Sequence, residues 1–205
     1  MKLSAIALGL AAAVLVQVPA NAETNVALNG TVTATGSGFG DWSAQWGSGS
    51  LSSLATVTDG KFLPAQQQWN IGTVFWNGTS NGDASNFVTI ALNAPATITH
   101  FALQADNNDD YLIQYLGAGN TWQNLVTIAP NRSWGMEMGY ASLASPVTAS
   151  AFRIRSAAGD GYYSISEFQA FGTIAAVPEP EMAGMLLGGL GLMIAAMRRR
   201  KQRTC

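Results

Sequence analysis

Short runs of alternating apolar and polar residues dominate the chain between Glu23 and Gly172. No stretch in this region shows the period of about 3.6 residues that marks an amphipathic helix. Alternation with a period of two is typical of strands that bury one face, and the Gly, Asn, Asp and Pro between the runs favour turns. The pattern predicts an all-β sandwich of about eight strands. The clearest strand candidates are residues 25–35, 87–92, 97–105, 111–116, 122–128, 150–156 and 162–171.

The alternation also assigns individual side chains to the core, because every second residue of a strand faces the same way. The expected core residues are Phe101, Leu103, Phe152, Ile154, Trp76, Trp122 and Phe87. Between two of the strands, Asn93-Ala94-Pro95 predicts a turn. The glycines of residues 117–120 permit the positive φ of a hairpin loop.

The N-terminus has the composition of a secretion signal. Lys2 supplies a positive charge, and residues 3–18 form an apolar segment rich in Ala and Leu. Ala20-Asn21-Ala22 provides the small residues that flank a cleavage site, so the mature chain is expected to begin at Glu23. Residues 1–22 are therefore predicted to be a secretory signal peptide, followed by one domain over residues 23–176.

Residues 177–205 combine three features in a fixed order. The motif Val177, Pro178, Glu179, Pro180 comes first, and its prolines keep it extended because they fix φ and block helix formation. An apolar run of sixteen residues, 182–197, follows without a charged residue and predicts a single transmembrane helix. This run is short, because a stable span needs about twenty residues. The basic block that follows would hold its end in the cytoplasm. It contains Arg198, Arg199, Arg200 and Lys201.

This order of motif, apolar segment and basic block resembles the PEP-CTERM sorting signal of bacteria that export extracellular polysaccharide. The resemblance implies that a membrane enzyme, exosortase, recognises the tail and cuts near the Pro-Glu-Pro motif. It also implies delivery to the cell envelope, the cell surface or the extracellular matrix. An ordinary C-terminal anchor shares the apolar helix and the charges, so only residues 177–180 separate the two interpretations.

The exported part of the chain is acidic. Six of the ten cations and two of the twelve acids lie in the terminal segments, which leaves four cations and ten acids, a net charge of −6. This charge argues against nucleic acid or anionic lipid as a partner and is compatible with neutral sugars and divalent cations. The single cysteine is Cys205 in the tail, so the exported domain forms no disulfide.

The strand layout resembles the jelly-roll β-sandwich of the galactose-binding-like domains, the family of discoidin and coagulation-factor C-type domains and of many sugar-binding modules. The likeness spans nearly the whole exported domain, although a long Gly- and Ser-rich insertion precedes Asp59 and the residues after Gly60 depart from the family pattern. The stretches that carry it are residues 25–27, 58–60 ahead of Trp76, 87–92, 152–155 and 164–168.

The resemblance implies a structural Ca²⁺ held by Asp59 of the Asp-Gly turn and Glu167 of the final strand, together with backbone carbonyls. A hard cation prefers several oxygen ligands, which this set would supply. In the alternative interpretation, Asp59 only caps its turn and Glu167 pairs with Arg153 or Arg155. The polar stretch Asp106 to Asp110 could hold a second cation, but a strand connection with Asx turns explains it better.

Three tryptophans are candidates for a glycan site, because a sugar ring packs on a flat aromatic face beside hydrogen-bonding groups. Trp42 and Trp46 lie in a Gly-rich loop, and Trp134 is a weaker candidate. The alternative is that these rings fold over one end of the sandwich and are buried.

His100 is the only histidine and has no evident catalytic partner, so no Ser–His–Asp set is expected and enzyme activity is not predicted. The sequence therefore favours an exported, non-catalytic carbohydrate-binding module whose partners are exosortase, a cell-surface or extracellular polysaccharide and, before processing, the membrane. The competing hypothesis is a structural or adhesive surface protein without a small-ligand pocket.

Overall fold

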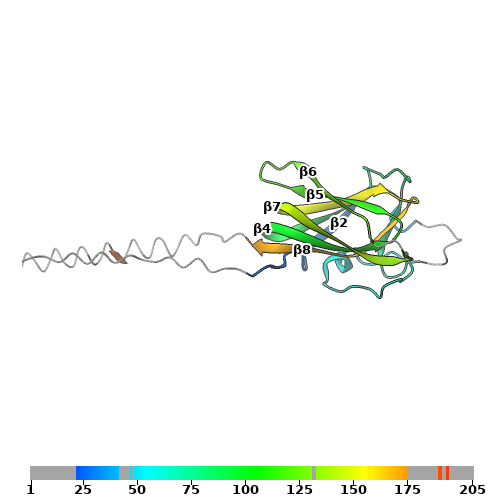
Figure 1. The fold of residues 1–205 in the computed structure, drawn as a ribbon, viewed down its shortest axis with the longest axis horizontal. Coiled ribbons are helices and arrows are strands. Elements are labelled where there is room, and N and C mark those ends of the chain that lie inside the picture. The colour runs from blue at the N-terminus through cyan, green and yellow to red at the C-terminus, as the bar shows by residue number, and fades with distance from the viewer. Residues whose placement is uncertain are drawn as a thin grey trace, which may run out of the picture.

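The computed structural model describes residues 22–41, 47, 49–130, 133–174, 189, 190 and 193. Within these residues the chain forms eight strands and a short 3-10 helix, η2 (Figure 1). The elements are β1 (Thr24–Asn25), β2 (Thr31–Thr35), η2 (Leu54–Thr58), β3 (Val74–Asn77), β4 (Phe87–Asp106), β5 (Asp110–Leu116), β6 (Trp122–Ile128), β7 (Met136–Ala158) and β8 (Tyr162–Ile174).

All strand pairs are antiparallel, in the order β1-β8-β4-β7-β5-β6, with β2 added to β4 and β3 added to β8. The two long strands β4 and β7 each contribute to both layers of the sandwich. The first half of β4 pairs with β2 and with the second half of β7, whereas the second half of β4 pairs with β8 and with the first half of β7. The prediction of an all-β, sandwich-like fold is confirmed.

The predicted turn at residues 93–95 is wrong, because β4 continues through it as a strand of 20 residues. The β4–β7 register shifts between Ala91 and Ala96. Pro95 falls in this irregular part, where a residue without an N–H removes no ladder hydrogen bond. The Asn-Ala-Pro sequence therefore marks a place where β4 passes from one layer to the other.

The core lies between the two layers and is built on aromatic rings. Phe152 of one layer packs against Phe101 and Phe168 of the other, with ring centroids 5.3 and 5.5 Å apart, and all three are buried. Burial of a side chain of this size contributes about 1.5–3 kcal/mol. The predicted core positions Phe101, Leu103, Phe152, Ile154 and Trp76 are confirmed.

Two expected core aromatics lie elsewhere. Phe87 and Trp122 are half-buried, and their rings flank the Arg153 guanidinium at 4.6 and 4.7 Å. Phe87 precedes the inward-facing Val88, so the alternation of β4 turns its side chain to the outer face. A cation between two rings is stabilised by the negative charge on the aromatic faces, which explains aromatic residues on an outer surface.

The start of β1 and two of the strand connections lie at opposite ends of the domain. Thr24 pairs with Gly172, so β1 begins beside the end of β8 (Figure 1). The β4–β5 and β7–β8 turns lie beyond Asp106 and before Tyr162, at the opposite end of β8, about 40 Å away along a strand of 13 residues. Among the described residues, no helix has the length and apolarity to cross a membrane. The predicted signal peptide cleavage motif, sorting motif, transmembrane helix and basic block lie wholly or almost wholly outside those residues.

Candidate functional site

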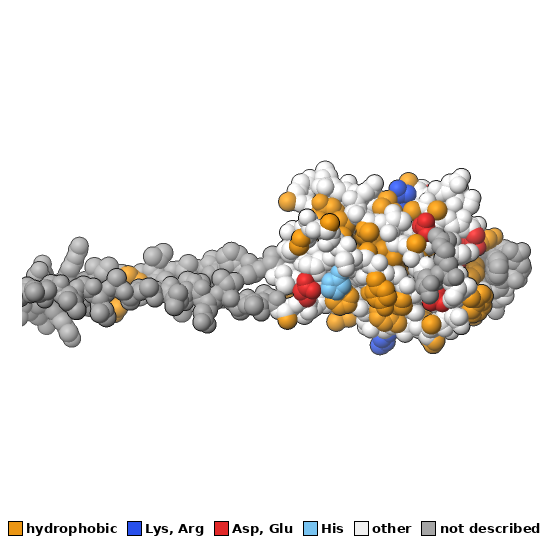
Figure 2. Space-filling model, viewed as in Figure 1, with side chains coloured by type: hydrophobic (Ala, Val, Ile, Leu, Met, Phe, Trp, Pro, Cys, Tyr) orange, Lys and Arg blue, Asp and Glu red, His pale blue; other side chains and the backbone are white. Residues whose placement is uncertain are grey.

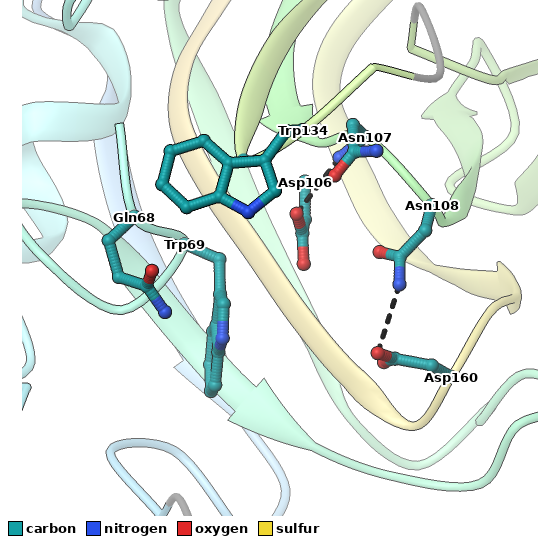
Figure 3. A pocket seen from close by; sticks show the side chains of 8 residues that line it. Gln68, Trp69, Asp106, Asn107, Asn108, Trp134 and Asp160 are labelled. Atoms are coloured by element: carbon teal, nitrogen blue, oxygen red, sulfur yellow. Dashed lines mark hydrogen bonds between the residues drawn. The ribbon is translucent and has the colours of Figure 1, made fainter. Parts of the chain in front are cut away.

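A cavity of about 100 Å³ opens at the end of the sandwich away from β1 and the end of β8. Four separate segments meet there: the loop before β3, the β4–β5 turn, the residues just before β7 and the β7–β8 turn. Figure 3 shows these side chains around a common space, with Asp106 between the tryptophans and the asparagines. The lining residues are Gln68, Trp69, Asp106, Asn107, Asn108, Trp134, Gly135 and Asp160.

Backbone hydrogen bonds hold these segments in place. Met136 donates its N–H to the Gln67 carbonyl, and Gln66 donates to the Met136 carbonyl, each over 2.9 Å. Asn107 donates to the carbonyl of Gly135 over 3.0 Å. Gly135 has φ +61°, and a Cβ there would lie 2.4 Å from the Gln67 oxygen. Only glycine fits this close approach. The cavity is therefore already formed in the fold without a ligand.

The two tryptophans of the cavity have different environments. Trp134 is 55% exposed and presents a free aromatic face. Trp69 is buried and packs on Phe75 and Tyr162, with ring centroids 5.4 and 5.6 Å apart. Trp69 therefore forms a fixed wall supported by its own small core, and Trp134 offers a surface for a ligand.

Carboxyl groups occupy the other side of the cavity. Asp106 is 5% exposed, and Asp109, directly behind it, is fully buried. Burial raises the pKa of Asp106 to about 7, while the Asn107 amide lowers it and the charge of Asp160 raises it by smaller amounts. Burial also raises the pKa of Asp109 to about 8, and the charges of Asp106 and Asp160 add to this. The site therefore gathers carboxyl groups in a poorly solvated place, where burial favours their neutral, protonated form.

Hydrogen bonds fix the geometry of these acids. Asp160 accepts the Asn108 side-chain N–H over 2.9 Å and the Tyr162 backbone N–H over 2.8 Å (Figure 3). Asp109 accepts the Asp160 N–H over 3.2 Å, which ties the β4–β5 turn to the β7–β8 turn. Asp106 accepts the Asn107 N–H through one carboxylate oxygen. The stretch connects β4 to β5 as predicted. The contact between Asp106 and Asn107 joins adjacent residues and is not the i to i+2 bond of an Asx turn, and the prediction omitted the burial.

A second carboxyl pair lies beside β8, where the structure brings the predicted calcium ligands together. Glu167 is fully buried and accepts the Gly60 N–H over 3.1 Å at its Oε1, next to Asp59. Burial raises the pKa of Glu167 to about 7, hydrogen bonds from Gln169 lower it, and the charge of Asp59 raises it. Its Oε2 has no hydrogen-bond partner among the described residues.

The alternative partners of Glu167 are engaged elsewhere. Arg153 donates to the Gln114 side chain over 2.8 Å, and Arg155 donates to the Ser156 carbonyl. Within the described part of the chain, no group of three or more His, Cys, Asp or Glu side chains converges on one point. Any cation near Glu167 would thus have Asp59, Glu167 and carbonyl oxygens as its protein ligands, a donor set that suits a hard ion.

The remaining predicted residues have mixed outcomes. Trp134 lines the cavity, whereas Trp42 and Trp46 lie outside the described residues, and their role stays a prediction. His100 is half-buried as expected; its ring stacks on Phe171 at 4.6 Å and lies 3.8 Å from Glu23, far from the cavity. The face in Figure 2 carries few charged side chains among many hydrophobic and uncharged ones.

Sequence reasoning missed Gln68, Trp69 and Asp160 as site residues. Asp160 lies far along the chain from the adjacent Gln68 and Trp69, and no local motif indicates that they meet. The one available signal was the pair of acid-rich turns, Asp-Asn-Asn-Asp-Asp at 106–110 and Gly-Asp-Gly at 159–161. Both turns end at neighbouring strands, but the sequence does not show that those strands are neighbours.

Comparison with known proteins gives results for the tail and for the domain. Residues 176–201 match the PEP-CTERM protein-sorting motif. No curated protein matches the chain in sequence. The family 32 carbohydrate-binding module of Streptococcus pneumoniae EndoD has the same fold, with a TM-score of 0.50 and 14% identity, over 73% of this chain and 100% of the module.

Two further modules overlap similar parts of the chain. Chitosan-binding module 1 of a chitosanase/glucanase from Paenibacillus sp. IK-5 is 21% identical, with a TM-score of 0.47 over 73% of this chain and 99% of that one. The family 32 module of C. perfringens NanJ, solved in complex with galactose, is 15% identical, with a TM-score of 0.47 over 73% and 98%. The fold assignment rests on the EndoD module. The chain thus carries a PEP-CTERM sorting motif behind a β-sandwich with the galactose-binding-like fold of family 32 carbohydrate-binding modules.

Proposed function

We propose that this protein is an exported, non-catalytic carbohydrate-binding module that binds glycan in the cavity beside Trp134. The observation that carries the proposal is the exposed indole of Trp134 on the wall of a preformed polar cavity. The apolar C–H face of a sugar ring stacks on such an indole, while amide and carboxylate groups bind its hydroxyls. Gln68, Asn107 and Asn108 supply groups of this kind.

The position of the cavity relative to the C-terminal end of β8 is compatible with sorting through the C-terminal tail. The cavity is at the opposite end of β8 from Ile174, after which the sorting motif follows in sequence. A ligand site at that end stays accessible when the C-terminus is held at a membrane or attached to another molecule. We therefore place its action at the cell envelope or in the exopolysaccharide matrix.

Processing at both ends follows from the same proposal. Mass spectrometry of the protein from its native host should find a chain that begins at Glu23 and lacks residues 198–205. The small residues before Glu23 and the Val-Pro-Glu-Pro motif define the two cuts. An intact C-terminus on the mature extracellular protein would contradict exosortase sorting.

A structural calcium site at Asp59 and Glu167 is the second part of the proposal. Its support is the buried, unpartnered Oε2 of Glu167 beside a second carboxylate. Calcium would offset the repulsion between these two charges and tie the Asp59 turn to β8. It would act on stability, since the pair is not part of the cavity at Trp134.

The proposed function is tested by screening the full-length protein against an array of immobilised glycans. Specific retention of a glycan, lost in Trp134→Ala, is the expected result. If no glycan is retained and the protein instead adheres to cells regardless of Trp134, the structural or adhesive hypothesis replaces the proposal.

A further inference from the structure

The cavity beside Trp134 has more carboxyl groups around it than binding of a neutral sugar requires. Asp106 and Asp160 both line it, and Asp109 lies buried behind them. Hydroxyl groups are bound well by amides, which the cavity already has in Gln68 and Asn107. Two carboxylates at one small cavity repel each other unless a cation lies between them or a proton binds one of them.

The described cations do not provide that compensation. Arg153 is held between Phe87 and Trp122, and Arg155 donates to a backbone carbonyl. Lys61 lines a different depression beside Asp59. Among the cavity-lining residues in the described part of the chain, none is Lys or Arg, and Asp106 and Asp160 both border the space that a ligand would occupy.

Asp106 is directed toward this space. It lines the cavity, is more than nine-tenths buried, and accepts the Asn107 amide through one of its oxygens. Figure 3 shows its carboxylate between the tryptophans and the Asn108–Asp160 pair. Burial that raises the pKa of Asp106 to about 7 is a cost that a bound cation would remove.

We propose that the ligand is an amino sugar with a free ammonium group, such as a glucosamine unit of a partly deacetylated polysaccharide. The sugar ring stacks on Trp134, and the ammonium group donates hydrogen bonds to Asp106 and Asp160. An acetylated amine has no charge and only one N–H, so it forms neither ion pair. This inference rests on the proposed glycan-binding function and narrows its ligand class.

The test measures binding of the full-length protein to glucosamine oligosaccharides and to the matching N-acetylated oligosaccharides of equal length by calorimetry. The free-amine ligand should bind roughly tenfold tighter or more, because charge-assisted hydrogen bonds are about twice as strong as neutral ones. Added salt should reduce this preference. Asp160→Asn should also reduce the preference for the free-amine ligand. The double substitution Asp106→Asn with Asp160→Asn should abolish this preference.

The controls separate charge from folding and from general glycan binding. Asp110→Asn removes a carboxylate from the same turn that does not line the cavity, and it should keep the preference. Asp160 is exposed, so its replacement should leave the melting temperature nearly unchanged. Trp134→Ala should weaken the binding of both the free-amine and the acetylated ligand.

Each other outcome overturns the inference in a recognisable way. If the acetylated ligand binds as well as the free amine, and Trp134 is needed for both, glycan binding stands and the amino-sugar assignment falls. If only a neutral glycan from the array binds, glycan binding likewise stands and the amino-sugar assignment falls. If neither oligosaccharide nor any glycan of the array binds, the proposed function falls as well.

Discussion

Two carboxyl sites in this domain have similar electrostatics and different surroundings. Asp106 at the cavity and Glu167 beside β8 both have a pKa raised to about 7 by burial, with a second acid close by. Asp106 faces an open cavity beside an exposed tryptophan, whereas Glu167 is enclosed and accepts the Gly60 N–H. A raised pKa alone thus does not distinguish a ligand site from a structural one; the access to solvent and the neighbouring groups do so.

The largest expected effect is on ligand binding at the cavity. Trp134→Ala should weaken glycan binding by about 2 kcal/mol or more, roughly thirtyfold in Kd, because it removes the stacking surface. The melting temperature should change little, since the side chain is 55% exposed. Calorimetry with a glycan from the array measures the first effect and thermal unfolding the second.

Tyr140→Ala is the matched control for Trp134→Ala. Tyr140 is an exposed aromatic residue on β7 that does not line the cavity, so its loss should leave glycan binding unchanged. Equal loss of binding in the two variants would contradict the cavity as the ligand site.

The next effect concerns stability at the enclosed site. Calcium should raise the melting temperature and a chelator should lower it, because a ligand that binds only the folded state adds about 2.7 kcal/mol at a hundredfold excess over Kd. Asp59→Ala and Glu167→Ala should each abolish this response, which differential scanning fluorimetry would detect. Arg153→Ala should retain it. Identical melting temperatures with calcium and with chelator would exclude the site.

A smaller effect is the pH dependence of stability in chelator. Asp106, Asp109 and Glu167 have folded-state pKa values of about 7, 8 and 7, above the usual values of about 3.9 for Asp and about 4.3 for Glu. The folded state therefore holds more protons than the unfolded state between about pH 4 and 8, so stability falls as pH rises through this window. The melting temperature should be lower at pH 8 than at pH 5.

Glu167→Gln separates the two sites in this measurement. The variant should lose part of the pH dependence and keep the part that comes from Asp106 and Asp109. A melting temperature that rises from pH 5 to pH 8 in the unsubstituted protein would show that these carboxyls are not buried as described.

The smallest expected effect belongs to the Gly-rich loop. Trp42→Ala with Trp46→Ala should weaken glycan retention less than Trp134→Ala does, with a nearly unchanged melting temperature, if the loop only adds contacts to a bound glycan. A large loss of stability in thermal unfolding would show instead that these rings are packed, and the loop would no longer be a candidate for binding.

The correct and the incorrect sequence predictions have a common physical basis. Alternation reports which face a residue occupies, so Phe101 and Phe152 were assigned correctly to the core. It does not report which face is buried when both faces carry apolar residues, and Phe87 and Trp122 were therefore misplaced. Pro95 predicted a turn because local propensity cannot show that a long strand continues through an irregularity.

The sequence by itself determined the all-β class and the identity of the sorting motif, because each depends on local pattern or on the order of motifs. Through a family resemblance it also predicted that the Asp59-Gly60 turn lies beside Glu167. Only the tertiary structure decided that Trp134, Asp106 and Asp160 share one cavity. Their segments are brought together by the pairing of β4, β7 and β8, and strand pairing depends on contacts between residues far apart in the chain. No local sequence signal encodes such contacts.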